Sequence, residues 1–188
     1  GASGFLGSYA GFALGKAGWD VTGASRSPAR GYSKSIELGS LGDIRSAIRS
    51  QPWDVVINCV AIANHEQCES DPSSARLINQ ELPGKWAYRS WQNGSQFVHF
   101  STDAVFDGSS ADLYAEDDAT GAPSVYGQTK RAGEEAVVSA NPEALVFRTN
   151  FFGWSQERGG GIFDFFANGL EWGTWMIGFC YFLVLSLY

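Results

Sequence analysis

The sequence predicts an α/β protein with a doubly wound parallel sheet of the Rossmann-like kind. Short runs of apolar and β-branched residues alternate along the chain with longer stretches of helical periodicity. One of the runs, VVINCV at 55–60, is continuously apolar, which is typical of a strand covered on both faces. A glycine-rich turn, GASGFLG, occupies residues 1–7 ahead of the first predicted helix, with no strand before it.

The remaining elements follow from the same patterns. Strands are expected at 20–24, 55–60, 96–100 and 144–149, and helices at 5–18, 41–50, 72–91 and 126–140. Ligands of parallel α/β sheets bind beyond the carboxyl ends of the strands. The expected site is therefore formed by the stretches that follow the strands: 1–7, 25–26, 61–64, 101–107 and 150–154.

Composition excludes several classes of protein. The 188 residues are 44% hydrophobic and 18% charged, which suits one soluble globular domain. A net charge of −7 makes nucleic acid a poor partner, because an acidic surface repels phosphate backbones. The odd number of cysteines, without regular spacing, favours free thiols and a cytoplasmic protein: Cys59, Cys68 and Cys180.

The last residues, 176–188, read MIGFCYFLVLSLY and carry no charge. They are shorter than the roughly 20 residues that a membrane-spanning helix needs, so no membrane partner is expected. We expect a buried strand or helix here; an interfacial or aggregation-prone segment is the alternative.

The glycine turn is a candidate phosphate site. Gly1, Gly4 and Gly7 would permit a tight turn and close approach of a pyrophosphate to the main chain. The amides of Ser3, Gly4, Phe5 and Leu6 would then face the phosphates. A simple packing turn produces the same spacing.

The end of the next strand bears on the choice of cofactor. Ser25 and Arg26 stand where an acidic residue would bind the ribose hydroxyls of NAD. A guanidinium can pair with a 2′-phosphate, which favours NADP(H) over NAD(H). The alternative is an exposed loop arginine.

The strongest chemical signal is the pair Tyr126 and Lys130, which lie on one face of a helix at i and i+4. The ammonium, together with an oxidised nicotinamide, would lower the pKa of the phenol and make it a usable acid–base group. Thr102 and its neighbour Ser101 follow a strand and supply hydroxyls for the same substrate oxygen. These hydroxyls could instead cap a turn, and a Tyr–Lys pair alone is often only solvated.

Five stretches carry a resemblance to a known family: GASGFLG, VINCVAIANHEQCESDP, FVHFSTDAVFDG, PSVYGQTKRAGEEAV and LVFRTNFFG. The chain resembles the extended short-chain dehydrogenase/reductases, and among them the dTDP-4-dehydrorhamnose reductase group. The resemblance implies hydride transfer from a nicotinamide to the C4 keto group of a nucleotide-linked 6-deoxy sugar. It implies Thr102, Tyr126 and Lys130 as the catalytic residues.

The same resemblance assigns further residues. It places the adenine pocket near Glu37 and Leu38, and the cofactor groove along Val60, Ala61 and Ile62. Asp103 and Asn150 would lie near the sugar. Trp154 is a candidate for stacking on the sugar ring.

The resemblance also implies the domain organisation. Residues 1–153 would be a dinucleotide-binding domain that lacks its first strand, and 154–188 the start of an incomplete substrate-binding lobe. The chain is thus expected to be truncated at both ends and inactive by itself. Two departures from the family affect specificity: Ala104 replaces an aromatic residue, and an apolar tail at 171–188 replaces a polar one.

Alternatives to a reductase stay open at this point. One is a sugar-nucleotide epimerase or dehydratase of the same superfamily; another is a non-catalytic regulatory subunit resembling that of methionine adenosyltransferase. A homodimer is an expected possibility. No metal is expected, because Cys59, His65 and Cys68 have no fourth ligand. His99 is expected to be a hydrogen-bonded core histidine.

Overall fold

The computed structural model describes residues 1–151 except 28, 30, 41, 111 and 112. The chain divides into two units, Gly1–Asn150 and Phe151–Tyr188, and the first of them is described below. The predictions for Trp154 and for the apolar tail lie outside the described residues.

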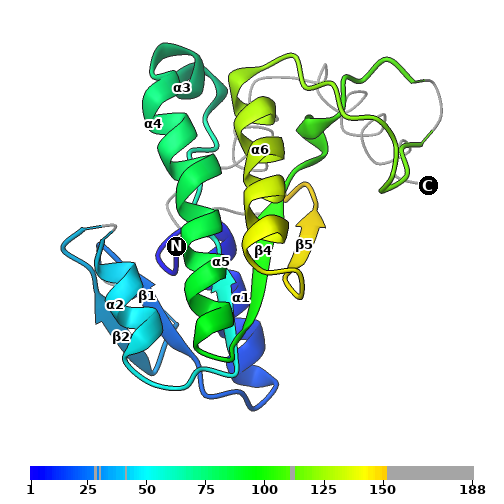
Figure 1. Cartoon of the computed structure of the whole chain (residues 1–188). Helices are drawn as coiled ribbons and strands as arrows, with labels where there is room; N and C mark the ends of the chain where they lie inside the picture. The colour runs from blue at the N-terminus through cyan, green and yellow to red at the C-terminus, as the bar shows by residue number, and fades with distance from the viewer. Residues whose placement is uncertain (28, 30, 41, 111–112, 152–188) are drawn as a thin grey trace, which may run out of the picture. The chain divides into compact units, whose positions relative to one another are not determined.

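Helices and strands alternate through the first unit, as predicted (Figure 1). The elements are α1 (Phe5–Lys16), β1 (Thr22–Ser25), β2 (Lys34–Glu37), α2 (Asp43–Arg49), β3 (Val55–Asn58), α3 (His65–Ser70), α4 (Pro72–Ala75), the π-helix η1 (Arg76–Glu81), α5 (Leu82–Gln92), β4 (Gln96–Ser101), the 3₁₀ turn η2 (Asp103–Val105), α6 (Val125–Ala140) and β5 (Leu145–Arg148). Every predicted helix and strand has a counterpart. The pattern missed β2 and α3, which are short and largely polar, and the three-residue turn η2.

All strand pairs are parallel, which confirms the predicted fold class. β1 pairs with β2, while β3, β4 and β5 form a second sheet in that order. Between β1 and β3 lies a cavity of about 600 Å³ lined by apolar side chains of both strands, of α1 and of α2. Ile57 of β3 is 36% exposed, so the expectation of a strand covered on both faces is wrong at this residue.

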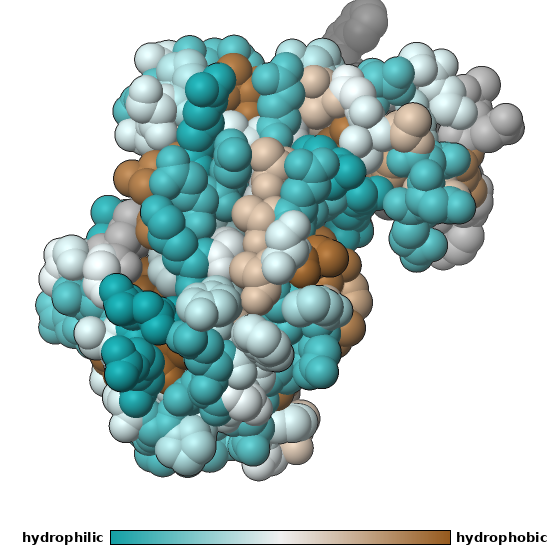
Figure 2. Space-filling model, viewed as in Figure 1, coloured by the Kyte–Doolittle hydropathy of each residue, from teal (hydrophilic) through white to brown (hydrophobic). Residues whose placement is uncertain are grey.

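The core lies where α5 and α6 cover the three-stranded sheet. Its buried residues are Ile48, Trp86, Ala87, Phe97 and Val137. In Figure 1, α5 and α6 run side by side, and the face that they present is largely hydrophilic in Figure 2. Amphipathic helices that bury one face against a sheet have this character.

The predicted helix at 72–91 is interrupted by the π-turn η1 (Arg76–Glu81). Pro83, at the start of α5, has no N–H for an i→i−4 bond, and the wider turn precedes it. Asn79 lies within this turn and is fully buried. A Cβ at Gly133 of α6 would come 2.1 Å from the Asn79 carbonyl oxygen, so only glycine fits where the two helices meet.

Candidate active site

The glycine turn leads directly into α1. A Cβ at Gly7 would lie 2.2 Å from the Gly1 oxygen, and one at Gly1 would lie 2.5 Å from the carbonyl carbon of Cys59. Gly4 is the N-cap of α1 and offers no capping side chain, so the first-turn amides of Phe5, Leu6 and Gly7 remain for an anion. The turn therefore presents main chain without side chains, which a pyrophosphate could approach closely.

Ser25 and Arg26 lie beside the glycine turn at the end of β1. The Ser25 hydroxyl is buried and donates to Ser27 O at 2.5 Å, and Ser27 Oγ donates to Ser3 Oγ at 3.3 Å. Arg26 is exposed, and its charge lowers the pKa of the Gly1 amine, after a larger effect of burial. The guanidinium thus lies near the predicted phosphate turn. Leu38 N donates to Ser25 O at 2.9 Å and Leu38 is buried, which brings this predicted adenine contact to the same strand end.

The loop after β3 is held by Asn79, which sequence reasoning missed. The Asn79 amide accepts from Ile62 N at 2.9 Å and donates to Ile62 O at 3.0 Å and to Thr129 Oγ1 at 3.3 Å. Val60 N donates to Asn58 Oδ1 at 2.9 Å, which fixes the start of the loop. The predicted groove residues are thereby positioned beside α6; Val60 and Ile62 are half-buried and Ala61 is exposed.

Thr102 and Tyr126 are brought together at the carboxyl end of β4. The Thr102 hydroxyl lies close enough to the Tyr126 phenol to act against the rise in the pKa of that phenol. Burial, the larger effect, raises that pKa, as do the nearby Asp103 and Cys68. Thr102 also caps η2, because its Oγ1 accepts from Ala104 N at 3.2 Å and donates to Asp103 Oδ1 at 3.1 Å. The turn cap predicted as the alternative for Thr102 is therefore observed.

Lys130 follows Tyr126 on α6, and its ammonium is bound to the strand backbone. Its Nζ donates to Phe100 O at 2.5 Å, so the ammonium is directed at the β4 backbone. Burial lowers the pKa of Lys130 to about 8, while Glu134 and Cys59 act in the opposite direction. In the protein without cofactor, burial of the phenol outweighs the other influences and the pKa of Tyr126 is raised; the lowering expected with an oxidised nicotinamide bound stays a prediction.

Asp103 and Asn150 meet beside this pair. Asn150 Nδ2 donates to Asp103 Oδ2 at 3.4 Å. Asp103 and Ala104 line an open groove of about 860 Å³, together with His65, Phe106, Tyr114 and Arg148. The His65 ring lies against Tyr126, with 4.6 Å between ring centroids. The groove therefore opens next to the phenol.

His99 and Asn58 form a buried pair behind the site. Asn58 Oδ1 already accepts a hydrogen bond from Val60 N. Asn58 Nδ2 is therefore the group that donates to His99 Nδ1, at 3.0 Å. This assigns the proton to Nε2, which has no partner among the described residues. The expectation of a hydrogen-bonded core histidine is therefore confirmed at Nδ1 and wrong at Nε2. Burial, and secondarily Lys130, lower the pKa of His99 to about 3.

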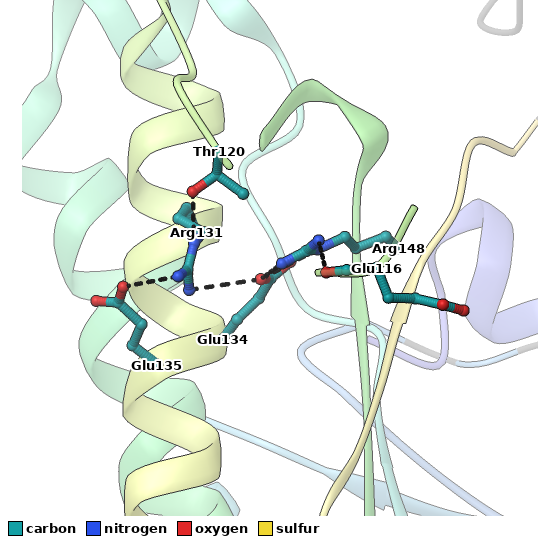
Figure 3. A network of polar contacts seen from close by, with 6 residues as sticks. All are labelled: Glu116, Thr120, Arg131, Glu134, Glu135 and Arg148. Atoms are coloured by element: carbon teal, nitrogen blue, oxygen red, sulfur yellow. Dashed lines mark hydrogen bonds and ion pairs between the residues drawn. The ribbon is translucent and has the colours of Figure 1, made fainter. Parts of the chain in front are cut away.

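A network of charged side chains centres on Glu134 of α6 (Figure 3). Arg148 of β5 binds Glu134 through two nitrogens, at 3.0 and 2.9 Å, and also donates to Glu116 O. Arg131 adds ion pairs to Glu134, at 3.8 Å, and to Glu135. Tyr126, Lys130 and Glu134 follow one another at intervals of four residues. The network therefore anchors the helix face that carries the candidate catalytic residues.

Metal and membrane features were searched over the part of the chain that the structure describes. It holds no cluster of three or more potential metal ligands. The Cys59 thiol is half-buried, and burial raises its pKa to about 11. None of the helices in the described residues is long and apolar enough to span a membrane.

The parallel fold, the glycine turn at α1 and the Thr–Tyr pair at the end of β4 define a domain of the short-chain dehydrogenase/reductase class. The chain belongs to the RmlD substrate binding domain family, which matches residues 1–162. It is 42% identical over 149 residues to a dTDP-4-dehydrorhamnose reductase of Mycolicibacterium smegmatis, covering 77% of this chain and 44% of the relative. It is 34% identical over 154 residues to a probable low-salt glycan biosynthesis reductase, Agl14, of Haloferax volcanii. That match covers 80% of this chain and 51% of the relative.

Solved structures have the same fold. A dTDP-4-dehydrorhamnose reductase of Clostridium acetobutylicum superposes with a TM-score of 0.69 at 27% identity, over 89% of this chain and 56% of that one. A dTDP-4-dehydrorhamnose reductase of Bacillus anthracis, solved in complex with NADP, superposes with a TM-score of 0.73 at 21% identity. The match covers 93% of this chain and 59% of that one, and at this identity the likeness concerns the fold alone. The chain spans about half the length of the curated relatives that it matches.

Proposed function

We propose that this chain is the cofactor-binding and proton-donating part of a cytoplasmic, NADP(H)-preferring reductase. Its substrate would be a nucleotide-linked 6-deoxy sugar with a keto group at C4. The observation that carries the proposal is that Thr102, Asp103 and Asn150 meet Tyr126 at the carboxyl end of β4, in a parallel fold whose glycine turn leads into α1. Relatives that are named dTDP-4-dehydrorhamnose reductases support the substrate class.

The residues present fit a dinucleotide. Gly1 and Gly7 keep side chains out of the space where the turn is tightest, and the first turn of α1 offers unpaired amides to a pyrophosphate. Arg26 would hold the 2′-phosphate of NADP(H), and Lys130 and Tyr126 the nicotinamide ribose. When bound, the reduced nicotinamide supplies the hydride.

The raised pKa keeps Tyr126 in the protonated state that a reductase needs. A phenol whose pKa lies above its usual value of 10.0 is protonated at neutral pH and can give its proton to the oxygen of a carbonyl under reduction. Thr102, which lies beside the phenol, would orient that oxygen. Lys130, with a pKa of about 8, is mainly charged at neutral pH and would stabilise the phenolate left after proton transfer.

A turnover assay tests the proposal directly. A full-length protein that carries these residues should consume NADPH when given a dTDP-linked 4-keto-6-deoxy sugar, and should consume none without the sugar. A protein that retains a bound cofactor and interconverts sugar nucleotides without net NADPH consumption would instead be an epimerase or dehydratase. Binding to a partner enzyme without turnover would indicate a regulatory subunit.

Cofactor preference is tested at Arg26. Arg26→Gln removes the charge that would pair with the 2′-phosphate, and a hydrogen bond to a charged group contributes about 2 kcal/mol. We expect the KM for NADPH to rise about 10- to 30-fold while the KM for NADH stays nearly constant. Arg26→Lys is the matched control and should retain part of the preference. Equal effects on both cofactors would contradict the assignment.

A further inference from the structure

The short helix α3 lies against the amino end of α6, the end that carries Tyr126 (Figure 1). Three side chains of α3 lie close to this end of α6: His65, Cys68 and Glu69. They occupy positions i, i+3 and i+4, which share one face of a helix. One face of α3 is therefore directed at the segment that holds the candidate proton donor.

Glu69 anchors the main chain next to Tyr126. Its carboxylate accepts a hydrogen bond from Val125 N at 2.8 Å, and Ser124 Oγ accepts one from Gly127 N at 3.1 Å. The first N–H groups of a helix have no partner within the helix, and a carboxylate near them is also favoured by the helix dipole. Glu69 thereby fixes the first residue of α6 from a different helix.

The His65 ring covers one side of the phenol. The two ring centroids are 4.6 Å apart, and the planes are inclined by 46°. His65 is itself exposed, whereas Tyr126 is half-buried, so the imidazole contributes to the burial of the phenol. Burial is the largest cause of the raised pKa of Tyr126. A ring packed against the tyrosine also restricts the rotation of its side chain.

Cys68 joins α3 to the loop that follows β3. It is fully buried, and its Sγ donates to Ile62 O at 3.4 Å. The same carbonyl accepts from Asn79 Nδ2 at 3.0 Å. At the amino end of α3, the side chain of Asn64 accepts from Gln67 N at 2.8 Å and caps the helix. The short helix is thus held at its start and at its buried face.

We propose that α3 sets the position of the catalytic phenol, with His65 and Glu69 as positioning residues that hold Tyr126 in the orientation for proton transfer. His65 acts through its ring and Glu69 through Val125 N. The inference rests on the proposed reductase function and extends it to the residues that support the proton donor.

The expected effect on the rate follows from the geometry of the site. Thr102 is fixed by the η2 turn, independently of α3, so a movement of the phenol alone would separate it from that hydroxyl. Catalytic groups must be held within about 0.5 Å of the productive geometry. A misplacement of about 1 Å can lower the rate about 10²-fold, and a partial loss of support should cost less.

Two pairs of variants of the full-length protein test the proposal. Glu69→Ala removes the acceptor for Val125 N and His65→Ala removes the ring, so we expect kcat to fall about 10-fold in each while the KM for NADPH stays nearly constant. Glu69→Gln keeps an acceptor oxygen and His65→Phe keeps a ring, so both should retain kcat within about threefold. The matched control is Glu66→Ala, an exposed residue in the first turn of α3, which should leave kcat unchanged.

Two further measurements distinguish positioning from a general loss of structure. The solvent isotope effect on kcat should rise in both alanine variants, because proton transfer becomes slower relative to the other steps; a smaller folded fraction would lower kcat without changing this effect. In NMR spectra of the protein with isotope-labelled tyrosine rings, the Tyr126 signal is the one that disappears in Tyr126→Phe. It should shift in both alanine variants and stay in place in Glu66→Ala.

The outcomes separate this inference from the proposed function. If the unaltered protein turns over and neither alanine variant changes kcat or the isotope effect, the inference is overturned. A loss of kcat in Glu69→Gln and His65→Phe as large as in the alanine variants would overturn it as well. If the unaltered protein shows no turnover, the proposed function fails, and the NMR signal decides alone: an unshifted Tyr126 signal in both alanine variants would show that α3 does not hold the phenol.

Discussion

Thr102, Tyr126 and Lys130 are held by different interactions at the end of β4. Thr102 is fixed by the η2 turn, Tyr126 by burial and the Thr102 hydroxyl, and Lys130 by the Phe100 carbonyl. The phenol is thus protonated at neutral pH, and the neighbouring Thr102 hydroxyl has a defined position. The lysine ammonium is bound to the β4 backbone.

The buried His99 makes the free energy of unfolding depend on pH. Its folded-state pKa of about 3 lies below the usual 6.5, so the unfolded chain takes up the proton first as the pH falls. Neutral His99 contributes a few kcal/mol to the free energy of unfolding. This contribution is complete above about pH 6.5 and is lost as the pH falls to about 3.

We expect His99→Gln to flatten the fall in the free energy of unfolding between pH 6.5 and 4, measured by urea titration. The control is His65→Gln, which alters the exposed histidine and leaves His99 in place. A pH dependence identical in His99→Gln and the unaltered chain would show that His99 is not the group responsible.

At the scale of elements, the ion pair between Arg148 and Glu134 joins β5 to α6. Glu134 is only 6% exposed and Arg148 21%, so removal of one partner leaves a buried charge. We expect Arg148→Met to lower the free energy of unfolding by about 3 kcal/mol. Lys85→Met, in the exposed pair with Glu81, is the control and should change it by less than about 1 kcal/mol.

A double-mutant cycle with Glu134→Gln separates the pair from other effects. The double variant should be less destabilised than the sum of the single variants, because neither charge is then left unpaired. Additive changes would mean that Arg148 contributes through its contacts with Glu116 or the Phe106 ring.

Periodicity predicted the elements whose apolar residues decide their structure. The strands at 55–58 and 96–101 and the helix at 125–140 were found within two residues of their observed ends. β2 was missed because KSIE is mostly exposed and polar. The π-turn before Pro83 was missed because a widened turn preserves the apolar pattern on both sides.

At the scale of the whole molecule, the predicted site residues converge where parallel strands end. Thr102, Tyr126, Asp103 and Asn150 could be found because each follows a strand or occupies a helix face with a recognisable spacing. Asn79, Arg148 and the Asn58–His99 pair could not. Their partners lie between 14 and 50 residues away, and no local pattern encodes such contacts.

The acidity of the molecule coexists with a site proposed for an anionic cofactor. The formal net charge is −7, yet Arg26 and the amino end of α1 lie together at the glycine turn. Local donors and the helix dipole decide anion binding over such short distances, because salt screens distant charges beyond about 10 Å.

The central claim is that the Tyr126 phenol, beside Thr102, delivers the proton during reduction. The most direct test is the kcat of Tyr126→Phe for NADPH-dependent reduction of a dTDP-linked 4-keto-6-deoxy sugar, measured in the full-length protein. We expect kcat to fall about 10²- to 10⁴-fold while the affinity for NADPH is retained, because the ring stays and only the acidic proton is lost. Turnover of Tyr126→Phe at the rate of the unaltered protein would contradict the account.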